Sequence, residues 1–260
     1  MVGQIFLTEL LKLRRTKITW VSLIAIAIMP MVGGLFTWIA KDPARAADLG
    51  LMGQKAQFIG VTADWPSFFL LILQTMGVAG MILVSVIAVY VFGREYTEQT
   101  AKNLLALPVG RHWFVIAKLG VVALWFAVLV GFLIAWSLVV GWLVGMPGFS
   151  LDLAVTASAD LFLAASVGWL LVPAVAWVSA VGRGYMAPLV FTFFMLLVGN
   201  VLGATGWGKW FPWSIVPLYS GVAGPRVETL APGSIGVLVA AFVAGTLGII
   251  WQLRHADNVQ

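Results

Sequence analysis

Six apolar runs, each long enough to cross a lipid bilayer, constrain this sequence more than any other feature. A membrane-spanning helix needs about 20 mostly apolar residues, because each residue adds ~1.5 Å across a ~30 Å hydrocarbon layer. A chain of 260 residues has room for six such spans with modest loops. We therefore expect an all-α, polytopic membrane protein that forms a single transmembrane domain over residues 1–260. The expected spans are Ile18–Ala40, Ser67–Phe92, Phe114–Val144, Ser158–Val181, Met186–Gly203 and Gly233–Leu253.

The composition excludes several classes of protein. Only 10% of the residues are charged and 62% are hydrophobic, whereas about a quarter of an average soluble domain is charged. The mean hydropathy of +1.03 excludes both a soluble globular domain and a disordered chain. The apolar runs are continuous rather than alternating, which argues against an outer-membrane barrel. The absence of cysteine excludes thiolate metal sites and a cysteine nucleophile.

The basic residues predict the orientation of the chain. With both termini in the cytoplasm, ten of the 15 Lys and Arg residues fall on the inner side and five on the outer side. This asymmetry follows the positive-inside rule and predicts an N-in, C-in topology. Because the basic residues are scattered along the edges of apolar runs, we interpret them as anchors at the lipid bilayer and expect no nucleic-acid partner.

Residues 1–17 predict an amphipathic helix before the first span. At about 100° per residue, Val2 and Leu13 fall on an apolar face, and Gln4 and Thr8 fall on an opposite, polar and basic face. Such an elbow helix can lie in the inner leaflet with its basic side toward anionic headgroups. The alternative is a simple basic flank of the first span. The residues expected to carry the elbow are Phe6, Leu10, Lys12, Arg14 and Arg15.

The loop 94–111 is the only polar connection of any length on the predicted cytoplasmic side. We expect a helix from about Glu95 to Leu107, ended by Pro108. In that helix Glu98 and Lys102 would form an i, i+4 ion pair. A stripe of less polar side chains would lie on another face and would have to be buried, either against the neighbouring helix ends or in the groove of a partner. The stripe consists of Tyr96, Thr100, Leu104 and Leu107.

The segment 204–232 is too apolar for a solvated loop and too interrupted for a span. We interpret it as a re-entrant or interfacial segment on the outer side, between the fifth and sixth spans. Gly203–Lys209 matches the spacing of a phosphate-binding loop, but Trp210 stands where Ser or Thr would be needed, and a span precedes the motif. We therefore do not expect nucleotide binding there.

Intramembrane chemistry is sparse in this sequence. Asp160 is interpreted as the only ionisable residue within a span, close to the outer end of the fourth span. No paired acids and no His-Glu-x-x-His motif occur in mid-span, so we expect no catalytic residue and no metal site. The uncharged polar residues Gln74, Thr75 and Asn200 suit either interhelical hydrogen bonds or the lining of a cavity.

A motif around the second loop resembles the type 2 ABC transporter permeases. The chain reads Arg94-Glu95-Tyr96-Thr97-Glu98-Gln99-Thr100, then Leu104-Leu105-Ala106-Leu107-Pro108-Val109-Gly110-Arg111, and Lys118 follows. An N-terminal stretch from Glu9 to Arg15 and the six spans add to the likeness, which is nearest to the short bacterial permeases associated with bacitracin or lantibiotic resistance. Gln99 departs from the commoner Gly, and Gly110 stands where Ser often precedes the Arg.

The resemblance implies an exporter subunit of the bacterial inner membrane that moves an amphipathic or hydrophobic substrate, such as a peptide antibiotic, a drug or a lipid. Two permeases, this chain and a second copy or a paralogue, would pair with two cytosolic ABC ATPase subunits. ATP and Mg would bind to the ATPase, and no cofactor to this chain. The resemblance places Gln74, Thr75, Phe194 and Asn200 along the substrate path. The residues implied in ATPase coupling are Arg94, Glu95, Tyr96, Glu98, Thr100, Leu104, Leu107, Pro108 and Arg111.

Two other functions remain open from the sequence. An ion-gradient-driven secondary transporter would work without an ATPase, but the scarcity of charge within the membrane counts against it. A non-transporting membrane subunit, for sensing or assembly, would co-purify with no ATPase and would stimulate none.

Overall fold

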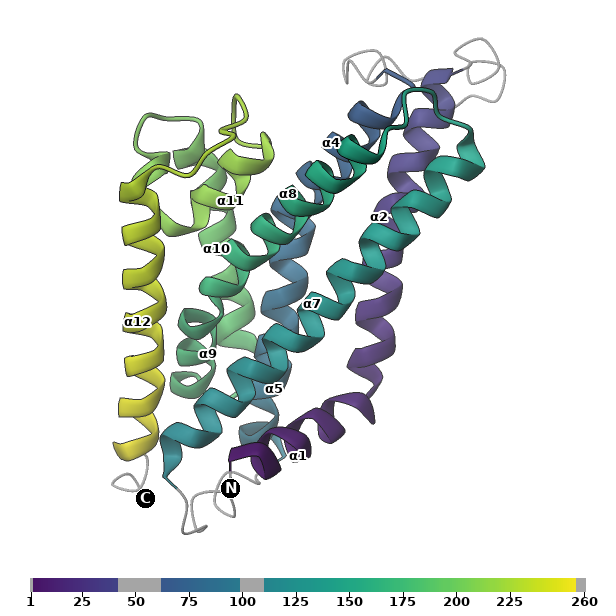
Figure 1. Cartoon of the computed structure of the whole chain (residues 1–260). Coiled ribbons are helices and arrows are strands. Elements are labelled where there is room, and N and C mark those ends of the chain that lie inside the picture. Colours follow the sequence, from purple (N-terminus) through teal and green to yellow (C-terminus); the bar gives the residue numbers. More distant parts are fainter. Residues whose placement is uncertain (1, 42–61, 99–109, 256–260) are drawn as a thin grey trace.

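The computed structural model describes residues 2–41, 62–98 and 110–255, and every regular element among them is helical (Figure 1). The predicted all-α class is confirmed for these residues, and six helical segments are long and apolar enough to cross a membrane. The elements are α1 (Val2–Arg14), α2 (Lys17–Lys41), α4 (Trp65–Thr75), the π-helix η2 (Met76–Gly80), α5 (Met81–Thr97), α7 (Arg111–Val144), α8 (Leu151–Leu170), α9 (Val172–Val181), α10 (Met186–Gly203), the 3-10 helix η3 (Gly208–Trp210), α11 (Pro212–Ser220) and α12 (Pro232–His255).

The second and fourth spans extend furthest beyond their predicted ranges, and a polar cap marks where each of them begins. The second span runs over Trp65–Thr97 as α4, η2 and α5, and the fourth over Leu151–Val181 as α8 and α9. The Asp64 carboxylate accepts a hydrogen bond of 2.9 Å from the Ser67 backbone N–H at the start of α4. Ser150 caps α8 in the same way. Each cap satisfies a backbone donor that the helix itself leaves unpaired.

The described chain begins and ends at the same end of the helical bundle, which we call the terminal end (Figure 1). The elbow helix α1 lies there, across the ends of the spans. The third span, α7, has 34 residues and crosses the bundle obliquely. At ~1.5 Å per residue it is roughly 50 Å long, well beyond a ~30 Å hydrocarbon layer. A helix of this length must be tilted in a bilayer or extend beyond it.

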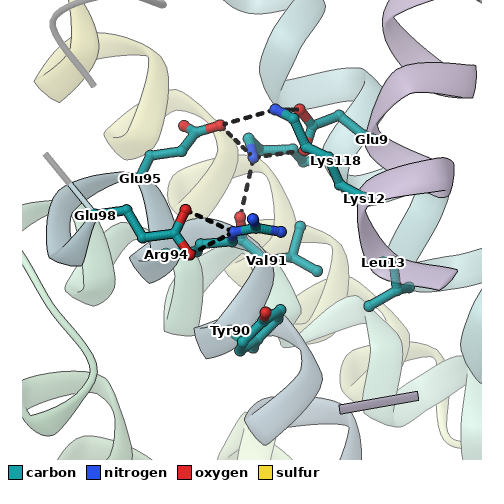
Figure 2. A pocket seen from close by; sticks show the side chains of 9 residues that line it. All are labelled: Glu9, Lys12, Leu13, Tyr90, Val91, Arg94, Glu95, Glu98 and Lys118. Atoms are coloured by element: carbon teal, nitrogen blue, oxygen red, sulfur yellow. Dashed lines mark hydrogen bonds and ion pairs between the residues drawn. The ribbon is translucent and has the colours of Figure 1, made fainter. Parts of the chain in front are cut away.

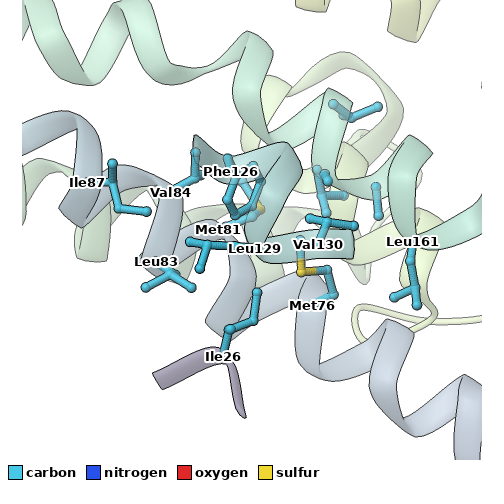
Figure 3. Packing of buried hydrophobic residues seen from close by; sticks show 14 of the residues in the cluster. Ile26, Met76, Met81, Leu83, Val84, Ile87, Phe126, Leu129, Val130 and Leu161 are labelled. Carbon is cyan, nitrogen blue, oxygen red and sulfur yellow. The ribbon is translucent and has the colours of Figure 1, made fainter. Parts of the chain in front are cut away.

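The second and fourth spans form the centre of the bundle. In an apolar stretch of 18 residues within each of these two spans, 56% of the residues are buried. The corresponding share is 28% in the fifth span and 22% in the sixth. Ile87 of α5, Leu129 of α7 and Leu161 of α8 are all fully buried in the central cluster (Figure 3). In lipid such contacts stabilise the bundle through close packing rather than through exclusion of water.

The π-helix η2 interrupts the second span where α11 packs against it. A Cβ atom added to Gly77 would lie 2.1 Å from the Ser220 hydroxyl oxygen, so only glycine permits this approach. On its other side α11 contacts α10, where a Cβ atom on Gly199 would lie 2.6 Å from the Trp213 carbonyl oxygen. The nine residues of α11 are too few to cross a bilayer, and this short helix packs into the bundle at the end opposite the termini (Figure 1).

Candidate functional site

A fully buried ammonium group lies at the terminal end of the bundle. Lys118 of α7 is 4% exposed, and its Nζ contacts three oxygen atoms from two other helices (Figure 2). It donates hydrogen bonds to Glu9 Oε2 of α1 at 2.8 Å and to the Val91 carbonyl oxygen of α5 at 2.9 Å, and it forms an ion pair of 2.8 Å with Glu95 Oε1 of α5. Two carboxylates therefore lie against the ammonium. A buried charge is tolerable only with such pairing.

The elbow helix contributes both an acid and a base to this site. Lys12 lies 2.5 Å from Glu9 Oε1, so Glu9 accepts from Lys12 with one oxygen and from Lys118 with the other. Burial acts to raise the pKa of the Glu9 carboxyl group, but the adjacent Lys118 ammonium and the hydrogen bonds from both lysines outweigh it. The pKa of Glu9 therefore lies below its ordinary value.

A second ion pair continues the site toward the loop after α5. Arg94 Nε lies 2.9 Å from both carboxylate oxygens of Glu98, the residue that follows α5. Together the six charged residues line a cavity of about 190 Å³, and we call them the basal ion cluster (Figure 2). The cluster contains three acids and three bases, so its net charge is zero. It consists of Glu9, Lys12, Arg94, Glu95, Glu98 and Lys118.

The connection between α9 and α10 holds the other side of α5. Tyr185 stacks on Tyr90, with ring centroids 6.2 Å apart and an angle of 8° between the planes. A Cβ atom on Gly93 would lie only 2.7 Å from Tyr185 Cδ1, so the aromatic ring fits against bare backbone. The end of the second span is thus fixed from two sides, by charges from α1 and α7 and by this ring.

The coupling residues predicted from the sequence fall into two groups. Arg94, Glu95 and Tyr96 belong to the last turn of α5, and Arg111 begins α7, where its guanidinium donates to the Leu253 carbonyl oxygen of α12. The others, apart from Glu98, lie outside the described residues: Thr100, Leu104, Leu107 and Pro108.

One detail predicted for the loop 94–111 requires correction. The helix predicted from Glu95 does not start there, because residues 95–97 continue the second span without a break. Its remaining part, up to Leu107, lies outside the described residues. Glu98 pairs with Arg94, one turn earlier in the chain. Its predicted partner Lys102 lies outside the described residues, so the pair Glu98–Lys102 stays a prediction.

The elbow helix forms, and its apolar face packs against the protein. Leu13 is buried, and a Cβ atom on Gly120 of α7 would lie 3.2 Å from the Phe6 ring. Phe6 and Leu10 pack against the core, and Lys12 pairs with Glu9. The contact of the basic residues with lipid headgroups stays a prediction. Leu7 and Leu11 are exposed on the opposite face, and so are Arg14 and Arg15.

The four residues expected along a substrate path lie on two different spans. Gln74 and Thr75 are half-buried at the end of α4, directly before η2. On α10, Asn200 donates from its side-chain amide to the Leu196 carbonyl oxygen at 2.8 Å, and Phe194 is exposed. The short helix α11 contacts both η2 and α10. A path lined by all four residues stays a prediction.

The ionisable residues within the spans differ from the prediction. Lys118 lies inside α7 and is buried, so the interpretation of Asp160 as the only such residue was wrong. Asp160 itself lies in the middle of α8 rather than close to the end of a span, because α8 begins at Leu151. The sequence contained signals for both: a lone Lys in an apolar run, and Glu9 among Phe6, Leu10 and Leu13 on one helix face.

The fold and the basal ion cluster define a polytopic helical membrane protein whose elbow helix, second span and third span meet at a buried charge. The described residues also lack the strand that a phosphate-binding loop would need before Gly203–Lys209. The chain belongs to the ABC-2 family of transporter proteins, whose family model matches residues 5–199.

A relative in Bacillus licheniformis is named as the bacitracin transport permease protein BCRB. It is 30% identical to this chain over 139 residues, which amount to 53% of this chain and 66% of that protein. The family and this relative support a transmembrane subunit of an ABC transporter, a transport subunit rather than an enzyme.

Proposed function

We propose that this chain is the permease subunit of an ATP-driven exporter in the bacterial plasma membrane, and that the loop 94–111 docks on a separate cytosolic ABC ATPase. Two permeases, as two copies or as this chain with a paralogue, would assemble with two ATPase subunits. ATP and Mg would bind to the ATPase, and no cofactor to this chain. The substrate would be amphipathic or hydrophobic: a peptide antibiotic, a drug or a lipid.

The position of the basal ion cluster is the observation that carries this proposal. Arg94 and Glu95 are the first residues of the loop 94–111, and Lys118 joins Glu95 to α7, the helix after the loop. Glu9 adds the elbow helix to the same group. A displacement of the loop by an ATPase would therefore move α1, α5 and α7 together instead of bending one helix end. Transmission of this kind needs a rigid unit that both partners contact.

The distribution of charge supports the orientation in the proposal. The terminal end carries the elbow helix with Arg14 and Arg15, together with the start of α7 at Arg111. An excess of Lys and Arg marks cytoplasmic segments, so this end would face the ATPase.

The fifth span supplies a surface on which a second permease can pack. Only 28% of its most apolar window is buried, and Phe193, Phe194 and Leu197 are exposed on α10. A second copy on this face would enclose a path beside Phe194 and Asn200, and Gln74 and Thr75 of the second span would complete its lining.

The proposal is tested by co-expressing the tagged chain with an ABC ATPase from the organism that makes this chain. ATP hydrolysis by the purified complex is then measured. The chain alone should hydrolyse no ATP, and the complex should hydrolyse ATP faster than the isolated ATPase. Leu104→Asp should abolish the association while leaving the chain in the membrane. Hydrolysis by the chain alone, or unchanged association with Leu104→Asp, would overturn the proposal. Ion-gradient-driven transport without ATPase would instead favour a secondary transporter.

A further inference from the structure

A pocket with apolar walls and one charged end lies between the second and fourth spans. Its volume is about 230 Å³, smaller than the roughly 300–1,000 Å³ typical of sites for drug-sized ligands. It can therefore take one chain or one end of a larger molecule. Most of the lining is aliphatic or aromatic, and the polar side chains are Thr156, Asp160 and Arg226. The other lining residues are Pro66, Phe69, Leu70, Leu73, Leu153 and Ala157.

The carboxylate of Asp160 is the fixed charge of this pocket. It extends from α8, inside the membrane-spanning part of the chain, and its side chain is 21% exposed. Tyr219 donates its hydroxyl to Asp160 Oδ1 at 2.6 Å, and the Arg226 guanidinium donates to Oδ2. A carboxylate in an apolar wall requires a cation, because desolvation of an isolated charge is costly.

Arg226 differs from Asp160 in how it is held. It lies in the irregular segment between α11 and α12, and its side chain is 31% exposed. Its guanidinium also lies 5.7 Å from the centroid of the buried Tyr219 ring. A carboxylate beside an aromatic face is the chemistry that binds ammonium and guanidinium groups. Asp160 and Tyr219, which lie on helices, thus form a cation site, and Arg226 occupies this site from an irregular segment.

The charges around the pocket favour a cation over an anion. Asp64 is the N-cap of α4 and Asp152 lies in the first turn of α8, so each of the two helices that line the pocket has an acidic residue at its N-terminus. Arg226 is the only basic residue among the described ones that line the pocket. An anionic headgroup would have to compete with the Asp160 carboxylate for Arg226, whereas a cationic one needs only to replace Arg226 at Asp160.

We propose that this pocket binds the cationic end of an amphiphile, with its ammonium or guanidinium group at Asp160 and its apolar chain between α4 and α8, and that Arg226 occupies the cation position when no ligand is bound. The inference rests on the proposed export function and narrows its substrate class to amphiphiles that carry a positive charge. Tyr219 holds the carboxylate in place in both states.

The test is equilibrium binding of radiolabelled dodecyltrimethylammonium to the purified full chain in dodecyl maltoside, with protein-free micelles subtracted. Asp160→Asn should weaken binding at least tenfold and leave the binding of labelled dodecanol unchanged. Arg226→Gln should tighten dodecyltrimethylammonium binding several-fold, because the competing cation is removed. Ala157→Phe should fill the pocket and weaken the binding of both probes.

Lys209→Gln is the matched control for Arg226→Gln. Lys209 is a basic residue of η3, the short helix before α11, and its Nζ lies 6.0 Å from the centroid of the Trp210 ring, but it does not line the pocket. Its substitution should leave the Kd unchanged. Arg226 is partly exposed and lies in an irregular segment, so we expect Arg226→Gln to fold. The direction of its change in Kd therefore tests the inference even where Asp160→Asn fails to fold.

Weaker binding of dodecyltrimethylammonium by Arg226→Gln, or dodecyl sulfate binding that depends on Arg226, would overturn the inference in favour of an anion site. Equal binding of dodecanol and the cation by the wild-type chain would also overturn it. This binding assay contains no ATPase, and association with the ATPase is measured separately by co-purification. If the chain associates with the ATPase but binds the cation no better than dodecanol, this inference fails and the proposed function stands. If the chain prefers the cation but associates with no ATPase, the proposed function fails and this inference stands.

Discussion

The ammonium group of Lys118 lies 2.8 Å from the Glu9 carboxylate, although 109 positions of sequence separate the two residues. This contact joins the elbow helix to the third span, and Glu95 joins both to the second span. The three helices therefore meet at one buried charge. A movement of the loop 94–111 by an ATPase would reach all three helices through these contacts of Lys118.

A double-mutant cycle should separate the buried ion pair from an exposed one. With Glu9→Gln and Lys118→Met, we expect a coupling free energy of about 1–3 kcal/mol, because each single change removes one of the ion pairs of the remaining buried charge. The matched control is the pair Arg94 and Glu98, where Glu98 is 46% exposed. There, Arg94→Gln with Glu98→Gln should give about 0.2–1 kcal/mol. Unfolding in sodium dodecyl sulfate measures both, and equal coupling in the two cycles would contradict the central role of Lys118.

The stabilisation by Glu9 should disappear in acid. Its pKa in the folded protein lies below the ordinary value of 4.5, so its contribution is complete above that pH and is lost as the pH falls through the folded pKa. We expect Glu9→Gln to lower the melting temperature at pH 7 and the difference from wild type to shrink below about pH 4. Fluorescence-detected melting between pH 3 and 8 provides the measurement. A difference that stays constant over this range would show that the carboxylate charge contributes nothing.

Glycine at position 77 should be essential for the packing of α11. Gly77→Ala places a methyl group 2.1 Å from the Ser220 hydroxyl oxygen, and we expect a loss of about 1–3 kcal/mol in the free energy of unfolding from this overpacking. Gly131→Ala in α7 is the control, since no atom lies within 4 Å of the added Cβ. It should be neutral or stabilise the helix by up to about 1 kcal/mol. The prediction fails if the two substitutions have the same effect on unfolding.

The last turn of α5 should be needed for ATPase docking even though it is partly buried. Glu95→Gln removes a charge that Lys118 contacts at 2.8 Å, and we expect it to weaken ATPase association through a misplaced loop. Val89→Ala is the comparison, because it alters the same helix in its apolar part. Co-purification of the ATPase with each tagged variant measures the effect. Normal association with Glu95→Gln would mean that the ion cluster does not position the loop.

The sequence predicted the spans well because continuous apolar runs of this length have no other stable arrangement in a membrane protein. It did not predict where α8 begins, since Ser150 acts through one cap hydrogen bond just outside the apolar run. The π-helix η2 was also missed. It lies where α11 packs against the second span at Gly77, a contact between segments far apart in the sequence.

The site was predicted less completely than the fold. The motif at Arg94 and Glu95 lies in the region of the basal ion cluster, but the Lys118 partner of Glu95 comes from the next span and the Glu9 partner of Lys118 from the elbow helix. Lys118 was not counted among the ionisable residues within a span, because it stands near the start of an apolar run, and the structure buries it with Glu9. The partners of Asp160 lie 59 and 66 positions away, at Tyr219 and Arg226. Pairings over such distances are set by how the spans pack, which periodicity alone does not determine.

The docking of the loop 94–111 on a motor is tested most directly by its accessibility. The chain has no native cysteine, so Leu104→Cys provides a single reactive thiol in the loop. Trp207→Cys provides a control at the opposite end, where the Trp207 side chain is 73% exposed. A membrane-impermeant maleimide should label Leu104→Cys only in inverted vesicles and Trp207→Cys only in intact cells. Bound ATPase should slow the labelling of Leu104→Cys at least tenfold. Labelling of Leu104→Cys from outside the cell, or at a rate that the ATPase does not change, would contradict the account.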